Sequence, residues 1–229
     1  MPSAAFRTRL RALVSVPTGA KPVRVIVIDE QPVTRIGMLS VLGAERDMMV
    51  VGTAADLAGA LAIIDRWSPD AVLIDPDLTG TEGPTAVRLI LERAPTARIV
   101  AFARHHGDEH IYRILEAGAC GYLFKNAPVS EVVAALREAR AGRSCVSRPA
   151  REQLAERSRW PELTTRERQV LALLAEGRSN ATIATLLEIS HGTVKLHVRS
   201  ILAKLGVDDR SQAALVALRR GFARMLSVR

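Results

Sequence analysis

Acidic side chains directly follow two apolar segments of the chain, and a lysine follows a third. Asp29 and Glu30 come after the first segment, Asp75 after the third, and Lys125 after the fifth. Mg²⁺ is usually held by one or two carboxylates together with phosphate oxygens. An aspartate beside that cation can accept a phosphoryl group as an acyl phosphate, and a lysine can pair with its charge. These residue types predict a phosphoryl-transfer site if the fold brings them to one place.

Short apolar segments alternate with longer amphipathic ones between Pro22 and residue 142, which predicts a doubly wound α/β domain. The near-continuous apolar character of the short segments indicates strands of a parallel sheet covered on both faces. The five expected strands are 23–29, 48–52, 71–75, 98–103 and 121–124. The expected helices are 32–43, 56–67, 83–94, 107–117 and 128–141. Ligands of such sheets lie beyond the carboxyl ends of the strands, where the acidic residues and the lysine fall.

Three segments of this domain resemble the signature stretches of response-regulator receiver domains, which have a flavodoxin-like fold. They are VRVIVIDEQPVTRIGMLSVL, PDAVLIDPDLTGTEG and RILEAGACGYLFKN, and the match spans about residues 23–141. The resemblance implies that Asp75 is the phosphoacceptor and that Asp29, Glu30 and Asp75 bind Mg²⁺. It also implies that Lys125 and Tyr122 couple to the phosphoryl group. The implied partner is a sensor histidine kinase or another phosphodonor.

The sequence departs from the receiver pattern at the end of the fourth strand. Ala103 stands where the family places Ser or Thr, and alanine has no hydroxyl to contact the phosphoryl group. Glu30 replaces the usual aspartate, Pro76 follows the phosphoacceptor, and Thr79 stands where proline is common. An alternative is therefore a phosphorylation-independent transcription factor with a weakly coupled receiver.

The segment VLIDPDLTGT also resembles the first motif of haloacid-dehalogenase-type phosphatases, with Asp75 as nucleophile and Asp77 as acid/base. That alternative makes the chain an enzyme. It requires a later acidic pair at a strand end, and none follows Lys125 before the C-terminal helices. The expectation is therefore that the chain is not an enzyme.

The C-terminal 67 residues lose the strand signal and become basic. Residues 163–229 carry 11 Lys/Arg against 5 Asp/Glu, within a chain of net charge +8, which suits a polyanion such as DNA. Four helices are expected, at 164–176, 180–187, 191–205 and 209–222, with Asn180 capping the second and Ser190 the third. Apolar residues recur along the third at 194, 198, 201 and 205 and predict a buried stripe. Lys195, Leu196 and Arg199 then project from the opposite side toward a major groove.

Residues 163–221 resemble the helix-turn-helix of LuxR/NarL/FixJ-type regulators, which implies double-stranded DNA as ligand and a homodimer on it. Ser179, Asn180, Thr193 and Lys204 are the expected phosphate contacts. One alternative is a helical module that binds another protein. Another is a small-molecule quorum sensor, which needs a roomy pocket, often aromatic-lined, whereas the chain is 3% aromatic.

The expected organisation is a basic N-terminal arm at 1–21, a receiver domain at 22–142, a linker at 143–162 and a four-helix DNA-binding domain at 163–229. No apolar run reaches the roughly 20 residues of a membrane span, so we expect a cytoplasmic protein with no membrane partner. Cys120 and Cys145 lack CxxC or Cys/His metal spacing and are expected to be reduced structural thiols.

Overall fold

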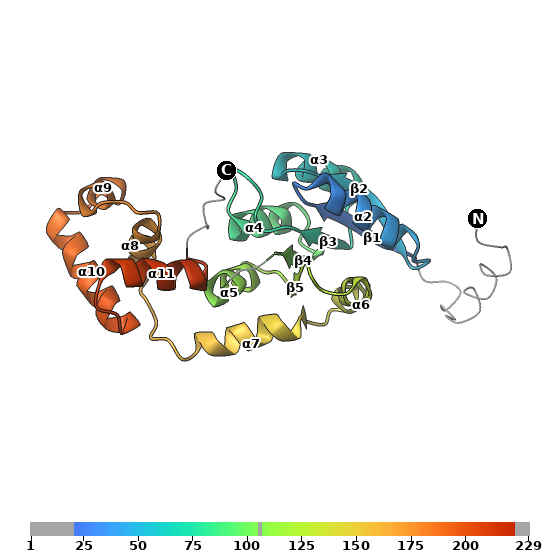
Figure 1. The fold of residues 1–229 in the computed structure, drawn as a ribbon. Coiled ribbons are helices and arrows are strands. Elements are labelled where there is room, and N and C mark those ends of the chain that lie inside the picture. The colour runs from blue at the N-terminus through green and yellow to red at the C-terminus, as the bar shows by residue number, and fades with distance from the viewer. Residues whose placement is uncertain (1–20, 105–106, 223–229) are drawn as a thin grey trace.

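The structure is a computed structural model that describes residues 21–104 and 107–222, so the predicted N-terminal arm lies almost wholly outside the described residues. An α/β unit is followed by a smaller helical unit (Figure 1). The strands are β1 Val23–Ile28, β2 Met48–Ala54, β3 Ala71–Ile74, β4 Arg98–Ala103, β5 Gly121–Phe124 and β6 Cys145–Val146. The helices of the α/β unit and its C-terminal extension are α2 Pro32–Gly43, α3 Leu57–Trp67, α4 Gly83–Arg93, α5 Asp108–Glu116, α6 Val129–Arg140 and α7 Arg148–Arg157.

The sheet is parallel, with strand order β2-β1-β3-β4-β5-β6, and its central strands are buried on both faces. Alternate residues of each strand supply two separate cores, as the period of two in a strand requires. One core packs against α3, α4 and α5. The other packs against α2 and α6. The predicted doubly wound α/β fold is confirmed.

The sheet has six strands among the described residues, where five were predicted. β6 consists of only two residues, and it lies in the segment 143–162 that the sequence predicts as linker. Its backbone bonds continue the sheet, because Cys145 N donates to Cys120 O at 3.0 Å and Ser147 N donates to Tyr122 O at 2.9 Å. A two-residue strand is too short to show a hydrophobic period, which explains why the pattern missed it.

Helices α8 Thr165–Ala175, α9 Asn180–Leu186, α10 His191–Leu205 and α11 Arg210–Arg220 form the predicted four-helix unit around its own core. Helix α8 begins with a capping box, in which Thr164 Oγ1 accepts from Glu167 N and Glu167 Oε2 accepts from Thr164 N. The residue that caps α9 is Ser179 rather than Asn180, which was the sequence-based expectation. Ser190 caps α10 as predicted.

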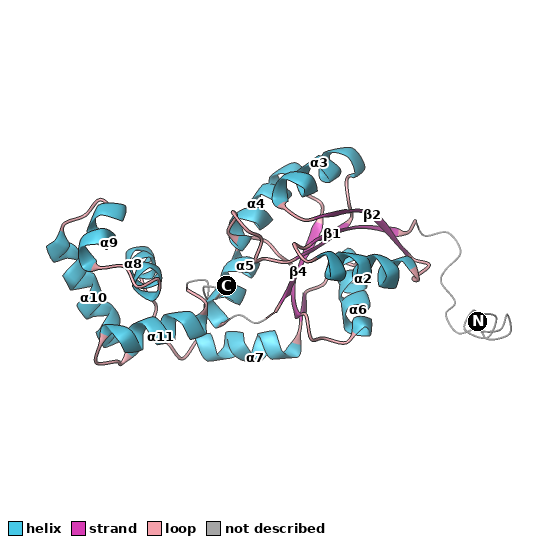
Figure 2. Cartoon of the chain, turned by 45° about the horizontal axis from the view of Figure 1, so that its top comes forward, coloured by secondary structure: helices cyan, strands magenta, loops and turns pink. Residues whose placement is uncertain are grey.

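The helical unit contacts the α/β unit through α11, which lies against α5, while α7 runs between the two units (Figures 1 and 2). Arg220, at the end of α11, bonds Asp108, the first residue of α5, at 2.9–3.2 Å. Both side chains are buried. In both views α10 lies on the side of the helical unit away from the sheet. Among the described residues, no helix has the length and apolar character to cross a membrane.

Candidate phosphoacceptor site and DNA interface

The strand register brings the predicted acidic residues and the lysine to one edge of the sheet. Ile28 pairs with Ile74, so Asp29 and Asp75, the next residue of each strand, are neighbours. Asp75 N donates to Ile28 O at 2.8 Å and fixes that register. On the other side of β4, Lys125 N donates to Ala103 O at 2.6 Å. The predicted clustering of the strand-end residues is therefore present in the structure.

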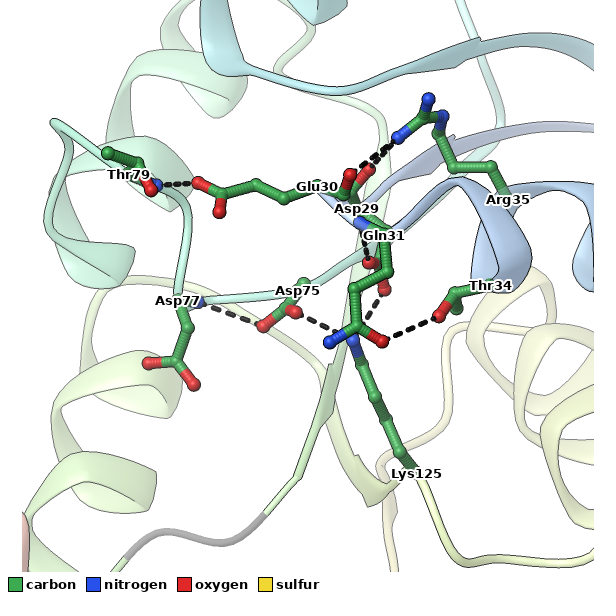
Figure 3. Close-up of polar contacts among 9 residues, drawn as sticks. All are labelled: Asp29, Glu30, Gln31, Thr34, Arg35, Asp75, Asp77, Thr79 and Lys125. Carbon is green, nitrogen blue, oxygen red and sulfur yellow. Dashed lines mark hydrogen bonds and ion pairs between the residues drawn. The ribbon is translucent and has the colours of Figure 1, made fainter. Parts of the chain in front are cut away.

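Lys125 reaches between the two aspartates (Figure 3). Its Nζ lies 2.6 Å from Asp29 Oδ2 and 2.6 Å from Asp75 Oδ2. The exposed fractions of the residues are 1% for Asp29 and 5% for Asp75, so two carboxylates are buried beside one ammonium group. Burying a charge is expensive unless it is paired. The pair of carboxylates keeps one uncompensated negative charge, which favours a further cation at this edge.

The remaining oxygen of each carboxylate is held by a backbone amide. Gln31 N donates to Asp29 Oδ1 at 2.8 Å, and Asp77 N donates to Asp75 Oδ1 at 3.0 Å. Two oriented carboxylates are the donor set that Mg²⁺ uses when water and phosphate oxygens complete its shell. The described residues contain no ready-made group of three metal-ligating side chains. Asp29 and Asp75 nonetheless fit Mg²⁺ by their chemistry.

Glu30, the third predicted metal ligand, points away from Lys125 (Figure 3). Its carboxylate accepts a short hydrogen bond from Thr79 N, in the loop that follows β3. The backbone oxygens of Asp29 and Glu30 are bound by Arg35 Nη1 at 2.6 and 3.0 Å. Glu30 therefore has to rotate about its own side chain before it can join Asp29 and Asp75 around a cation.

Ala103 and Tyr122, the predicted coupling residues, are both fully buried on the face covered by α3, α4 and α5. The ring of Tyr122 packs edge-on against Phe124 and His110, with centroid distances of 5.7 and 6.4 Å. Burial, followed by the negative charges of Asp77 and Asp75, raises the pKa of the Tyr122 phenol. The hydroxyl has no hydrogen-bond partner among the described residues.

The predicted recognition helix is α10, and the apolar stripe predicted from the residue spacing faces the core of the helical unit. Val194, Ile201 and Leu205 are buried, and Val198 is half-buried. Lys195, Leu196 and Arg199 are exposed, and Leu196 keeps 69% of its surface in solvent. An apolar side chain this exposed between two cations suits a thymine methyl in a groove lined by phosphates.

The predicted phosphate contacts differ in their surroundings. Ser179 is the N-cap of α9, and its hydroxyl contacts Thr182 Oγ1 at 2.9 Å; Thr193 lies in the first turn of α10, and its hydroxyl contacts the Ser190 cap at 2.8 Å. Asn180 is half-buried, and its Oδ1 lacks a partner in the described residues. Lys204 Nζ bonds Glu167 Oε2 at 2.7 Å and Glu162 O at 3.1 Å. Lys204 thus ties α10 to α8, and contact with a phosphate requires that pair to open.

Two features of the structure escaped the sequence-based prediction. The first is Glu167, which joins the capping box to Lys204 and to Ser200 Oγ at 2.7 Å. The Thr-x-x-Glu pattern predicts the capping box, but no pattern in the sequence predicts that Glu167 also bonds Ser200 and Lys204 on α10. The second is the Asp108–Arg220 pair, whose members are 112 residues apart and belong to different units.

Comparison with known proteins matches both units to protein families. Residues 25–137 match the response regulator receiver domain, and residues 161–217 match the bacterial regulatory proteins of the luxR family. LiaR, a transcriptional regulatory protein of Bacillus subtilis, is 33% identical over 205 residues, covering 86% of this chain and 97% of LiaR.

Two solved structures share the arrangement. The response regulator ChrA of a heme-sensing two-component system is 34% identical, with a TM-score of 0.54 over 86% of this chain and 97% of ChrA. A structure of RcsB dimers bound to DNA is 22% identical, with a TM-score of 0.65 over 86% of this chain and 98% of that chain, and supports the fold alone.

A receiver domain joined to a luxR-type helix-turn-helix defines a response regulator that acts as a DNA-binding transcription regulator. The chain belongs to the NarL/FixJ family of these regulators. Membership of this family excludes the phosphatase and quorum-sensor alternatives, and it identifies the helical unit as a DNA-binding module rather than a protein-binding one.

Proposed function

We propose that Asp75 is the phosphoacceptor of this regulator and that its phosphorylation modulates DNA binding and dimerisation. The observation that carries the proposal is Lys125, which sits 2.6 Å from both buried carboxylates. The phosphodonor is a sensor histidine kinase or another carrier of an activated phosphoryl group. Mg²⁺ would be held by Asp29 and Asp75, joined by Glu30 after rotation, and would neutralise phosphate charge when bound.

The local chemistry follows from the contacts of Asp75. Asp75 Oδ1 accepts a hydrogen bond from Asp77 N, and Asp75 Oδ2 contacts the Lys125 ammonium. If the ammonium shifts toward Asp29, Asp75 Oδ2 becomes free to react. An oxygen of Asp75 forms the new bond to phosphorus, and the bond from phosphorus to the donor breaks. Lys125 can then pair with a phosphoryl oxygen, since an ammonium on a flexible stem has three donors.

A weakly coupled receiver remains the second candidate, and a specific observation favours it. Ala103 is buried and has no hydroxyl, and the Tyr122 hydroxyl has no hydrogen-bond partner among the described residues. No hydroxyl therefore connects the phosphoryl site to the aromatic residue. In this structure the route from the receiver to the helical unit is the Asp108–Arg220 contact at the start of α5. We propose that phosphorylation acts on DNA binding through that contact, with a smaller effect than in receivers that keep the hydroxyl.

We also propose that α10 reads the major groove through Lys195, Leu196 and Arg199, with Ser179, Asn180 and Thr193 at phosphates. Homodimers would then bind half-sites about 10 bp apart, because two symmetric helices must meet one face of the duplex. The proposed domains are a receiver at 22–142, a linker at 143–162 and a DNA-binding domain at 163–229. The proposed location is the cytoplasm.

Acyl-phosphate labelling tests the phosphoacceptor. The full-length chain, given a radiolabelled small acyl phosphate and Mg²⁺, should incorporate label, and Asp75→Asn should abolish it. Asp77→Asn is the matched control, because this neighbouring carboxylate is predicted to leave the labelling intact. Equal labelling of wild type and Asp75→Asn would remove Asp75 from the role.

Binding to a selected DNA site tests the recognition helix. Arg199→Ala and Lys195→Ala should each cost on the order of 1–3 kcal/mol if the side chain reads a base edge, and should relax specificity there. Arg88→Ala, on the exposed face of α4, is the control for a lost positive charge. If the α10 variants and Arg88→Ala weaken binding equally, α10 does not read the groove.

A further inference from the structure

The two cysteines of the chain meet at the outer edge of the sheet. Cys145 N donates to Cys120 O at 3.0 Å, and Cys145 Sγ lies 3.7 Å from the same oxygen. Cys145 pairs with Gly121, one residue after Cys120. Strand spacing and rise then place the two Cα atoms about 6 Å apart, inside the roughly 4.4–6.8 Å range of disulfides. The backbone is already in position for a Cys120–Cys145 bond.

Gly121 provides the space for this arrangement. A Cβ atom at that position would lie 2.1 Å from Cys145 Sγ, a distance that no side chain tolerates. The absence of a side chain lets the Cys145 thiol lie over the strand, where it donates to Cys120 O, while Cys120 Sγ donates to Ile99 O at 3.3 Å. Both cysteines are free in the structure, with Cys145 buried and Cys120 partly exposed.

A half-buried cation lies beside the pair. The guanidinium of Arg98, at the start of β4, lies next to Cys120, and its Nε has no hydrogen-bond partner among the described residues. The side-chain contact with Cys145 lowers the pKa of Cys120 to about 7 against the opposing effect of burial, and the charge of Arg98 also lowers it. The same contact, together with burial, raises the pKa of Cys145. Of the two thiols, Cys120 is therefore the one that loses its proton more readily.

We propose that Cys120 and Cys145 form an oxidisable dithiol that reacts with hydroperoxides. Cys120 loses its proton to solvent, its thiolate attacks one oxygen of the peroxide, and the O–O bond breaks; Cys120 becomes a sulfenic acid, and the departing hydroxide takes up that proton to give water. The sulfur of Cys145 then attacks the Cys120 sulfur, and its proton leaves with the displaced hydroxide as a second water. Two thiols and one hydrogen peroxide give one disulfide and two waters, so atoms and electrons balance.

A Cys120–Cys145 disulfide would join β6 to the segment that leads into β5. β6 holds only two residues and directly precedes α7, which leads to the DNA-binding unit. A disulfide would fasten β6 to β5 and so fix the point at which the linker leaves the sheet. The sequence predicted reduced structural thiols, because 25 positions separate the cysteines and no local motif joins them.

Peroxide titration of the reduced full-length chain tests the proposal. After treatment with hydrogen peroxide, the intact monomer should lose about 2 Da, and both thiols should become unreactive to an alkylating reagent until a reductant is added. Cys145→Ser should instead trap a Cys120 sulfenic acid that reacts with a dimedone probe. Cys120→Ser should leave the remaining thiol unoxidised under the same conditions.

Arg98→Met isolates the contribution of the cation. It should slow alkylation of Cys120 at pH 7 by a factor of roughly three to ten, because less thiolate is present. Thermal unfolding of each variant shows whether the fold persists. Thiols that stay alkylatable after peroxide, a disulfide that joins two chains, or equal oxidation of Cys120→Ser and wild type would each overturn the proposal.

Discussion

Ala103 stands where the receiver pattern places Ser or Thr. It is fully buried at the end of β4, and the hydroxyl of Tyr122, on the same face, has no partner in the described part of the chain. A ligand shifts an equilibrium only by its differential interaction with the two states. The phosphoryl group loses one such interaction when a methyl group replaces a hydroxyl.

Ala103→Thr should therefore strengthen the effect of phosphorylation on DNA affinity. A hydrogen bond to a charged group contributes about 1.5–3 kcal/mol, which is roughly a tenfold to hundredfold gain in coupling. The measurement compares DNA affinity of wild type and Ala103→Thr, each with and without acyl phosphate. Ala103→Ser controls for the added volume of the threonine methyl. A large effect of phosphorylation already present in wild type, with no gain in either variant, would contradict this role of Ala103.

Tyr122→Phe should leave the free energy of unfolding unchanged or raise it by about 1 kcal/mol. Its hydroxyl is buried without a partner, and removing such a group relieves a desolvation penalty of roughly 1–3 kcal/mol. The ring contacts with Phe124 and His110 are kept. Urea unfolding measures the difference. A loss of more than 1 kcal/mol would show that the hydroxyl makes a bond in solution.

At the scale of elements, the sequence was sufficient for strands whose burial produces a continuous apolar run and for every described helix except α7, which lies in the segment predicted as linker. The three strands that Asp29, Asp75 and Lys125 follow were predicted with their ends nearly in place, because the ends coincide with a change from apolar to charged residues. β6 was missed because two residues carry no period. The α9 cap was assigned one residue late, since Ser179 and Asn180 are both good caps and only backbone geometry separates them.

Glu167 makes the junction of α8 and α10 sensitive to acid. Burial raises its pKa, but hydrogen bonds from Lys204, Ser200 and Thr164 outweigh burial and hold the pKa at about 2, below the ordinary 4.5. A depressed pKa stabilises the fold above the unfolded-state value, and that stabilisation is lost as pH falls through the folded-state value. The contribution of Glu167 should be complete at pH 7, decline below about pH 4.5, and vanish near pH 2.

Urea unfolding at several pH values measures this contribution. Glu167→Gln should lower the free energy of unfolding by about 1–2 kcal/mol at pH 7, a value reduced from the full linkage because the junction lies near solvent. The difference from wild type should shrink between pH 4.5 and pH 3. Glu176→Gln, an exposed carboxylate at the end of α8, is the control. A difference that stays constant with pH would mean that the Lys204 bond does not form.

At the scale of the whole molecule, the DNA-binding unit contacts the receiver through α11, and α10 lies on the far side (Figures 1 and 2). The receiver therefore does not cover α10 in this structure. No sequence pattern predicted this contact, because Asp108 and Arg220 are each ordinary helix-terminal charges until the two units meet. Their pairing is a property of the tertiary structure alone.

Arg220 is the residue through which this arrangement can be tested. Its guanidinium makes three bonds to Asp108, lies over the rings of Trp160 and Phe222 at 5.0 and 5.2 Å, and is 6% exposed. Arg220→Ala leaves the Asp108 carboxylate buried without its cation, which costs roughly 3–5 kcal/mol while the contact stays closed. Separating the two units hydrates that carboxylate, so the variant should favour the open arrangement.

Small-angle scattering should then show a larger radius of gyration for Arg220→Ala than for wild type, and hydrogen exchange should quicken in α5 and α11 together. Arg219→Ala, an exposed neighbour on the same helix, should leave both measurements unchanged. If phosphorylation acts through this contact, the DNA affinity of unphosphorylated Arg220→Ala should approach that of phosphorylated wild type, because the variant has already lost the interaction that phosphorylation would release. Arg220→Ala with wild-type scattering and exchange would show that the Asp108–Arg220 pair does not hold the units together, and the coupling route proposed here would fall with it.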